Sequence, residues 1–177
     1  MRFFVTGEQN RQLLMNALIL MFLGYIALLW ISNGLLYFHK MGLNPDSVVA
    51  YYLGSKQDFS QPKSYQSLLE TAHFHLFAIG ILVLTLTHLM LMTDLPVQLK
   101  IWLSGLTYFG ALTNEAAGWL IRFAHPAFAY VKIGAFILLE TSLAALVIVV
   151  SASLIISRHR ARAKLSEDYM DSSKVQR

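Results

Sequence analysis

The sequence has 177 residues, of which 56% are hydrophobic and 14% are charged, and its formal net charge at pH 7 is +4. Soluble domains have about 45–50% apolar and about 25% charged residues, so this composition argues against a soluble enzyme or a disordered chain and is typical of a membrane protein. The chain has no cysteine, which excludes Cys-ligated iron–sulfur clusters, Cys-ligated zinc, c-type haem attachment and thiol catalysis. Any metal or redox cofactor would therefore need His, Met, Glu or Asp as ligands.

Four apolar segments are long enough to cross a bilayer as helices, a length of about 20 residues. They cover residues 13–38, 68–92, 101–123 and 128–157. The first has no small-residue cleavage site after it, so we interpret it as an uncleaved signal-anchor. Short connections between the last three predict antiparallel neighbours. The expected fold is therefore all-α, an antiparallel bundle of four transmembrane helices forming a single membrane domain, residues 1–177.

Lysine and arginine residues predict the orientation of these spans. An even number of spans puts both termini on one side, and nine of the 14 basic residues fall on that side. By the positive-inside rule, both termini are expected in the cytoplasm, with residues 158–177 as a cytoplasmic tail. The basic cluster from Arg158 to Lys164 follows the last span directly. We interpret it as a lipid-headgroup anchor, and we expect no nucleic-acid partner.

The long loop on the opposite side, residues 39–67, contains a helix signal of its own. Its start has a good N-cap residue, a proline suited to the first helical position and an acid favoured by the helix dipole, and a glycine follows its end. These residues are Asn44, Pro45, Asp46 and Gly54. They predict a short helix over Pro45–Leu53.

Ionisable side chains inside spans are costly and by default suggest function. The antiparallel path places four histidines toward the outer end of the bundle, namely His39, His73, His75 and His125. Glu115 lies about seven residues from the outer boundary of its span, or about 10 Å deep at the helical rise, which is the depth of His73. Ligands from several helices could therefore converge in the outer half.

Several of these residues also have a structural interpretation. Ser67 and Glu70 match a capping box at the head of the second span. Glu115 could pair with Arg122 or Lys132 as a buried charge partner. We expect Glu115 to belong to the cluster near the histidines. Glu140, near the middle of the last span, is expected at a helix–helix or subunit contact.

A short segment carries a resemblance to known proteins. Residues 72–80, with the sequence AHFHLFAIG, resemble the His-x-His-Leu-x-x-x-Gly helix starts of haem- and haem–copper-containing bacterial membrane proteins, including the oxidase superfamily and the nitric-oxide-response family. The resemblance implies that His73 or His75 ligates haem or copper and that Gly80 makes room for a flat ring. The chain also looks broadly like small four-helix inner-membrane proteins of Gram-negative bacteria, which implies the bacterial inner membrane as its location.

These observations lead us to expect a small membrane cytochrome-like redox subunit. It would bind b-type haem near the periplasmic side and pass electrons between the quinone pool and a membrane or periplasmic partner. The expected cofactor-binding residues are His73, His75, His125, His39, Glu115 and Tyr108. The axial ligands would be His73 or His75 together with His125 or His39. Glu115 or Tyr108 would tune the iron through hydrogen bonds around the ligands.

Two other classes of function stay open. One is a non-haem site for iron, copper or zinc with Glu70, His73, His75 and Glu115 as ligands, since Glu70 and His73 have the Glu-x-x-His spacing of di-iron bundles. The other is a cofactor-free assembly or scaffold subunit of a larger complex or a homo-oligomer. Hydrolase motifs and a phosphate-binding loop are absent from the sequence, so an electron-transfer subunit is favoured over a self-contained enzyme.

Overall fold

The computed structural model describes residues 2–57 and 59–175, with side chains described for residues 11, 14–57 and 59–157. This part of the chain forms five α-helices and no β-strand. The helices are α1 (Arg2–Lys40), α2 (Pro45–Leu53), α3 (Tyr65–Leu91), α4 (Val97–Phe123) and α5 (Phe128–Val175). The all-α expectation is therefore confirmed.

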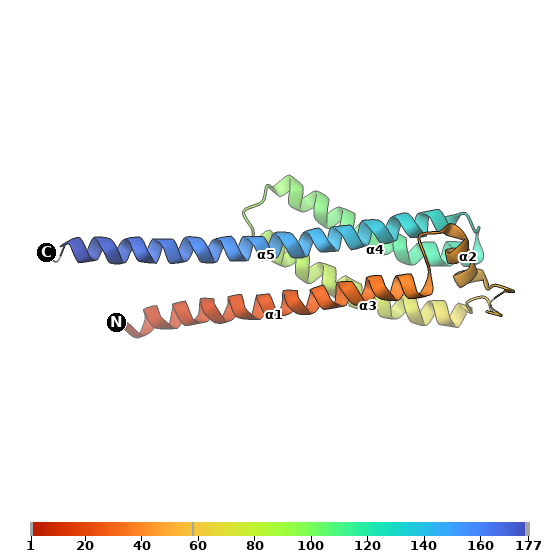
Figure 1. The fold of residues 1–177 in the computed structure, drawn as a ribbon, viewed down its shortest axis with the longest axis horizontal. Coiled ribbons are helices and arrows are strands. Elements are labelled where there is room, and N and C mark those ends of the chain that lie inside the picture. The colour runs from red at the N-terminus through yellow and green to blue at the C-terminus, as the bar shows by residue number, and fades with distance from the viewer. Residues whose placement is uncertain (1, 58, 176–177) are drawn as a thin grey trace.

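The four long helices lie side by side and alternate in direction (Figure 1). Both termini lie at one end of the molecule, and the short helix α2 lies at the other. Helix α5 is central, because it contacts each of the other four helices, whereas α1 packs mainly on α5. Residues 158–175, expected as a tail after the last span, continue α5 as helix.

Three helices are long and apolar enough to cross a membrane. The candidate spans are Leu14–Lys40 in α1, Tyr65–Leu91 in α3 and Phe128–Ser157 in α5. Helix α4 has 27 residues, as many as α3, but it is not among them. Its sequence is less apolar because it carries polar side chains such as Asn114 and Glu115 along its length. The chain is thus a membrane protein with three candidate spans, and the expected span over residues 101–123 is a helix of more polar composition.

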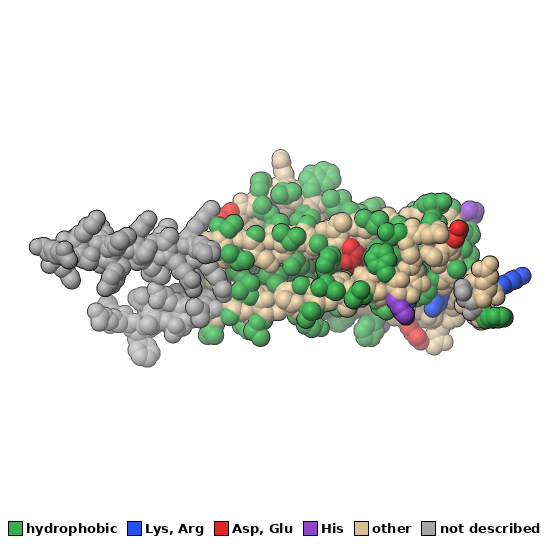
Figure 2. Space-filling view, in the orientation of Figure 1, with side chains coloured by type: hydrophobic (Ala, Val, Ile, Leu, Met, Phe, Trp, Pro, Cys, Tyr) green, Lys and Arg blue, Asp and Glu red, His purple; other side chains and the backbone are tan. Residues whose placement is uncertain are grey.

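The buried apolar residues form two clusters along the bundle axis. Nearer the termini, the cluster comprises Leu23, Ile26, Val83, Leu86, Met90, Leu139, Leu143, Leu146 and Val150. At the α2 end, it comprises Tyr37, Met41, Val48, Tyr52, Leu68, Ile121, Ala129 and Phe136. Many other apolar side chains stay exposed and are scattered over the bundle surface (Figure 2), as expected where lipid replaces water as the solvent.

Helix α2 has the predicted bounds. The Asn44 side chain accepts a hydrogen bond from the Asp46 backbone N–H at 3.1 Å, and Gly54, with φ of 82°, ends the helix. The helix packs on α4 and α5. Tyr52 fits against Gly118 of α4 so closely that a Cβ at position 118 would lie 2.9 Å from the tyrosine ring. The close fit seats α2 across the end of the bundle.

The expected capping box at Ser67 is wrong by three residues. Helix α3 begins at Tyr65, and the Ser64 side chain accepts a hydrogen bond from the Ser67 backbone N–H at 3.1 Å. The carboxylate of Glu70 instead accepts a hydrogen bond from Gln66 Nε2 at 2.9 Å. Ser64 comes earlier in the chain and offers the same hydroxyl, so the helix gains a further turn.

Candidate functional site

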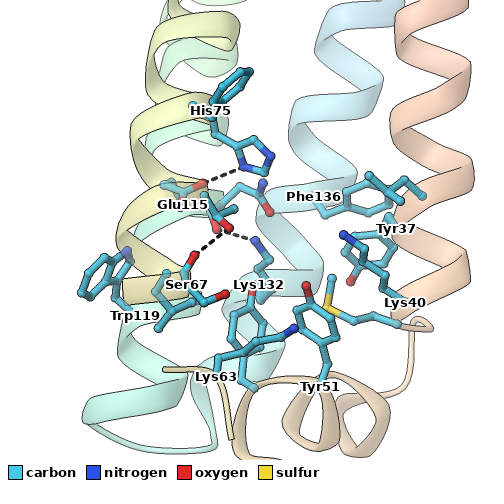
Figure 3. Close-up of a pocket in the computed structure, with 18 of the residues that line it drawn as sticks. Tyr37, Lys40, Tyr51, Lys63, Ser67, His75, Glu115, Trp119, Lys132 and Phe136 are labelled. Carbon is cyan, nitrogen blue, oxygen red and sulfur yellow. Dashed lines mark hydrogen bonds and ion pairs between the residues drawn. The ribbon is translucent and has the colours of Figure 1, made fainter. Parts of the chain in front are cut away.

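A cavity of about 450 Å³ lies at the α2 end of the bundle, between residues of all five helices. We call it the chamber (Figure 3). Its charged and amide side chains are Asn33, Lys40, Lys63, Glu70, His75, Asn114, Glu115 and Lys132, and aromatic rings complete much of the wall. Small-molecule sites measure roughly 300–1,000 Å³ and combine apolar walls with a few polar groups. The chamber is therefore the candidate binding site.

An ion pair links α3 and α4 in the chamber wall. His75 Nδ1 lies 3.1 Å from Glu115 Oε2, and the side chains are 46% and 15% exposed, respectively. An ionised carboxylate only accepts hydrogen bonds, so Nδ1–H is the donor. This bond fixes the orientation of the imidazole and leaves Nε2 without a partner among the described residues. His75 can therefore offer Nε2 to a bound molecule.

Lys132 brings a buried ammonium group into the chamber from α5. The residue is only 6% exposed, and its Nζ donates a hydrogen bond to the Asn114 backbone carbonyl at 2.7 Å. The ammonium also lies 5.9 Å from the centroid of the Tyr52 ring. Lys132 therefore has a carbonyl and a ring as partners. The sequence suggested that Lys132 pairs with Glu115. Among the described side chains, Glu115 pairs with His75 instead.

Arg122, the other cation considered for Glu115, has a different role. Its Nε donates a hydrogen bond to the Lys63 backbone carbonyl at 2.8 Å. The Lys63 ammonium in turn lies 4.4 Å from the centroid of the Tyr51 ring, which lines the chamber. These contacts connect the loop before α3 to α2 and α4. Arg122 therefore holds the backbone of Lys63, a residue of the chamber wall, instead of pairing with Glu115.

Two buried polar atoms in the chamber wall have no hydrogen-bond partner among the described residues, namely Tyr37 Oη and Asn114 Oδ1. The Tyr37 ring is held by stacking on Phe136, with centroids 3.6 Å apart and planes 8° from parallel. Leaving a buried polar group unpaired costs about 1–3 kcal/mol. Because native proteins rarely leave such atoms unpaired, they mark positions where a ligand or an ordered water completes the chamber.

A second hollow of about 140 Å³ shares His75 and Glu115 with the chamber. We call it the apolar groove. It lies between α3 and α4, and the rest of its lining is Leu76, Ile79, Gly80, Val83, Tyr108, Ala111 and Leu112. A Cβ at Gly80 would meet nothing within 4 Å, so the space beside this glycine is open. A polar chamber and an apolar groove that meet at one ion pair suit an amphiphilic molecule.

The structure brings together three of the six residues expected to bind a cofactor. His75 and Glu115 form the ion pair, and Tyr108 lines the apolar groove beside them. The remaining residues lie elsewhere. His39, His73 and His125 are exposed and line neither the chamber nor the apolar groove. His125 Nδ1 accepts a hydrogen bond from the Ala127 backbone N–H at 3.1 Å in the turn before α5.

The proposed metal ligands are not assembled as a cluster. Among the described residues, no three His, Asp or Glu side chains form a group that could hold a metal ion. Glu70 lines the chamber but bonds Gln66, and His73 points outside it. Neither hollow contains a second histidine that could face His75, so the residues present do not fit a haem with two histidine ligands.

Glu140 lies at a helix–helix contact, as expected. Its carboxylate accepts a hydrogen bond from Asn33 Nδ2 of α1, and its backbone carbonyl accepts one from Trp30 Nε1 at 3.0 Å. Both bonds join α1 to α5. Asn33 and Tyr37 were not predicted as site residues, although their spacing of four residues puts them on one face of α1.

Comparison with known proteins supports the membrane assignment. A family model described as a transmembrane helical domain matches residues 42–161, more than half of the chain. The chain belongs to this family. The match begins before α2 and ends in α5, so it includes the residues of α2, α3 and α4 that line the chamber. No curated protein and no solved structure matches the chain, and no haem-protein family is recognised in it.

Proposed function

We propose that this protein binds a quinone from the bilayer and serves as a quinone-binding subunit of a membrane redox complex. The quinone ring would occupy the chamber, and the start of its apolar chain would occupy the apolar groove. The observation that carries the proposal is the position of the ion pair between His75 and Glu115, which lines both hollows. A quinone has a polar ring joined to an apolar chain, which matches a polar chamber joined to an apolar groove.

The lining of the chamber suits a flat ring that carries oxygen atoms. Quinone oxygens need hydrogen-bond donors, and the chamber offers Lys132 Nζ, the Tyr37 hydroxyl and, in the protonated imidazole, His75 Nε2. The aromatic walls include Trp119 and the stacked pair of Tyr37 and Phe136, which suit the flat apolar surface of a planar ring. The three donors come from different helices, so together they would fix the orientation of the ring.

The ion pair also suits the proton transfers that accompany quinone chemistry. Reducing a quinone to a quinol consumes electrons and an equal number of protons, and the reverse reaction releases them. Histidine exchanges protons near neutral pH, and a carboxylate beside it stabilises the charged imidazolium. His75 is partly exposed whereas Glu115 is mostly covered, so the pair connects the chamber to its surroundings. The electrons would be exchanged with a partner subunit that carries a redox centre.

We further propose that α4 crosses the membrane as a fourth span. It is as long as α3, packs against α3 and α5, and turns Asn114 and Glu115 into the chamber. Polar residues that line an internal cavity are tolerated in a membrane helix. With four spans, the positive-inside rule puts both termini in the cytoplasm of a bacterium and the chamber on the periplasmic side of its inner membrane.

Haem b remains a second candidate ligand because of one feature. A histidine that ligates a metal usually donates its other ring N–H to a carboxylate, and His75 donates Nδ1–H to Glu115 in this way. Haem would then take Nε2 of His75 as a single histidine ligand. An absorption spectrum of the purified protein, before and after dithionite, distinguishes this candidate, since bound haem gives a Soret band and a sharp reduced α-band.

The binding proposal can be tested with a short-chain quinone. Decylubiquinone would be titrated into the full chain in lipid nanodiscs while the tryptophan fluorescence is followed, to which Trp119 in the chamber wall contributes together with Trp30 and Trp102. We expect saturable quenching, and we expect His75→Ala to weaken binding by about tenfold or more, as for a hydrogen bond to a charged group. His73→Ala is the matched control, because His73 lies two residues away and outside both hollows.

Two results would contradict the proposal. If decylubiquinone fails to bind, the function is wrong, and competition with phosphatidylglycerol vesicles would then ask whether the chamber holds a lipid headgroup. If quinone binds but His73→Ala weakens it as much as His75→Ala, the ligand does not occupy the chamber. If neither a quinone nor a lipid binds and the spectrum contains no haem, a cofactor-free scaffold subunit is favoured.

A further inference from the structure

The chamber contains hydrogen-bond acceptors that the protein itself does not satisfy. Asn114 Oδ1 is buried and has no partner among the described residues. Glu115 accepts from His75 at Oε2, and its side chain is 15% exposed, so its other oxygen is not one of the buried atoms without a partner. An amide oxygen and a carboxylate oxygen cannot donate to each other. A molecule that completes this wall must therefore bring donors of its own.

Two of the nearby donors each make a hydrogen bond within the protein, and neither reaches Asn114 Oδ1. Lys132 Nζ donates to the backbone carbonyl of Asn114, not to the side-chain oxygen, and His75 Nδ1 donates to Glu115. The Tyr37 hydroxyl is the other buried atom without a partner, and a hydroxyl both donates and accepts. In Figure 3, Tyr37 lies across the chamber from His75 and Glu115.

The two redox forms of the proposed ligand differ in whether they can donate hydrogen bonds. The oxygens of a quinone only accept hydrogen bonds, whereas each hydroxyl of a quinol donates one bond and also accepts. A quinol could therefore donate to Asn114 Oδ1 while still accepting from Lys132 or Tyr37. A quinone oxygen would face Asn114 Oδ1 acceptor to acceptor, or would require the side-chain amide to rotate and present Nδ2 in place of Oδ1. Sites with buried polar groups discriminate strongly against ligands that leave those groups unpaired.

We infer that the chamber binds the reduced, hydroxyl-bearing quinol more tightly than the quinone, and that Asn114 is the residue that distinguishes the two forms. This inference rests on the proposed function. A tenfold preference for the reduced form would raise the midpoint potential of the bound two-electron couple by about 30 mV. The site would therefore draw quinol from the membrane pool. Oxidation of the quinol would pass its electrons to the redox centre of the partner subunit and release its hydroxyl protons to the pair of His75 and Glu115.

The test compares both forms of one compound on the full chain in nanodiscs. Decylubiquinol and decylubiquinone would be titrated separately under anaerobic conditions, with tryptophan fluorescence as the readout. We expect the quinol to bind at least about tenfold more tightly. Equal affinities, or a preference for the quinone, would overturn the inference while leaving the proposed function in place. If neither form binds, the inference falls together with the proposed function.

Substitutions at Asn114 test the assigned residue. Asn114→Leu removes the acceptor and should abolish the preference by weakening quinol binding, whereas Asn114→Asp keeps an acceptor beside Lys132 and should retain it. Gln98→Leu removes an exposed amide near the start of the same helix and is the matched control. An unchanged preference in Asn114→Leu would overturn the role of Asn114. If Asn114→Leu loses the preference only because it misfolds, the result says nothing about the acceptor. Asn114→Asp therefore has to keep the preference for quinol.

Discussion

At the residue scale, the two histidines of α3 differ in what they contact. His73 and His75 are two residues apart, or about 200° around a helix, so the sequence indicated that only one could face a given neighbour. The structure pairs His75 with Glu115. The choice depends on the rotation of α3 about its axis, which is fixed by burial of Leu68 and Ala72. That rotation is a tertiary property, so the histidine motif alone could not identify the inward residue.

The first prediction concerns Tyr52, which lies in α2 outside the candidate spans. Burial raises the pKa of the Tyr52 phenol above its usual range, and the Glu115 carboxylate contributes in the same direction. A raised folded-state pKa contributes stability below the unfolded value of about 10, and that contribution is lost as the pH rises above it. We therefore expect the melting temperature in detergent to fall above about pH 10, and Tyr52→Phe to reduce this fall.

Tyr130→Phe is the control for this experiment, because the Tyr130 side chain is 69% exposed. Its removal should leave the alkaline loss of stability unchanged. An equal effect of the two substitutions on the pH profile would mean that burial of Tyr52 does not cause the loss.

At the scale of helices, local signals fixed some boundaries and not others. The bounds of α2 were predicted correctly because Asn44 and Gly54, which flank the helix, determine its two ends through local contacts. The start of α3 was misplaced because Ser64 and Ser67 both have a hydroxyl that can cap a helix. Only the path of the preceding loop shows that Ser64 is the cap. Some residues of the chamber wall could be recognised from the sequence. Glu115 could be recognised as a costly charge, but Tyr37 looked like an ordinary aromatic residue at a span end.

The contact between α2 and α4 gives the second prediction. A Cβ at Gly118 would lie 2.9 Å from the Tyr52 ring, so Gly118→Ala should displace α2 and destabilise the protein by about 1–3 kcal/mol. Gly105→Ala is the matched control on the same helix, because a Cβ there meets nothing within 4 Å. The control should be neutral or slightly stabilising, since alanine favours helix over glycine. Unfolding in mixed detergent micelles measures both changes, and equal stabilities would contradict the close packing of Tyr52.

The contact between α1 and α5 gives the third prediction. Asn33 donates to the Glu140 carboxylate, and hydrogen bonds between membrane helices contribute about 0.6 kcal/mol on average and up to about 1.7 kcal/mol. We expect Asn33→Leu and Glu140→Leu each to destabilise the protein, and the double variant to lose less than the sum of the two. Strictly additive losses in the same unfolding assay would show that the two side chains do not interact.

At the scale of the whole molecule, the basic residues after the last candidate span lie at the same end as both termini. Both termini lie at the end of the bundle opposite α2 (Figure 1), and the basic segment that follows the last candidate span extends from that end. Three spans would put the termini on opposite sides of a membrane, whereas four would put them on one side. Whether α4 crosses therefore decides which compartment the chamber faces. If α4 did not cross, the aligned helices α3, α4 and α5 would have to separate within the membrane.

The last prediction tests whether α4 crosses, and the absence of cysteine from the chain makes the test direct. Single cysteines would be introduced as Met92→Cys before α4 and His125→Cys after it, two exposed positions next to the helix ends. If α4 crosses with both termini in the cytoplasm, a membrane-impermeant maleimide labels His125→Cys in intact cells, but labels Met92→Cys only after permeabilisation. Phe59→Cys, at a position 93% exposed in the loop after α2, should label like His125→Cys and serves as the outer control. Labelling of both Met92→Cys and His125→Cys in intact cells would show that α4 does not cross, whereas labelling of Met92→Cys alone would reverse the orientation and move the chamber to the cytoplasmic side.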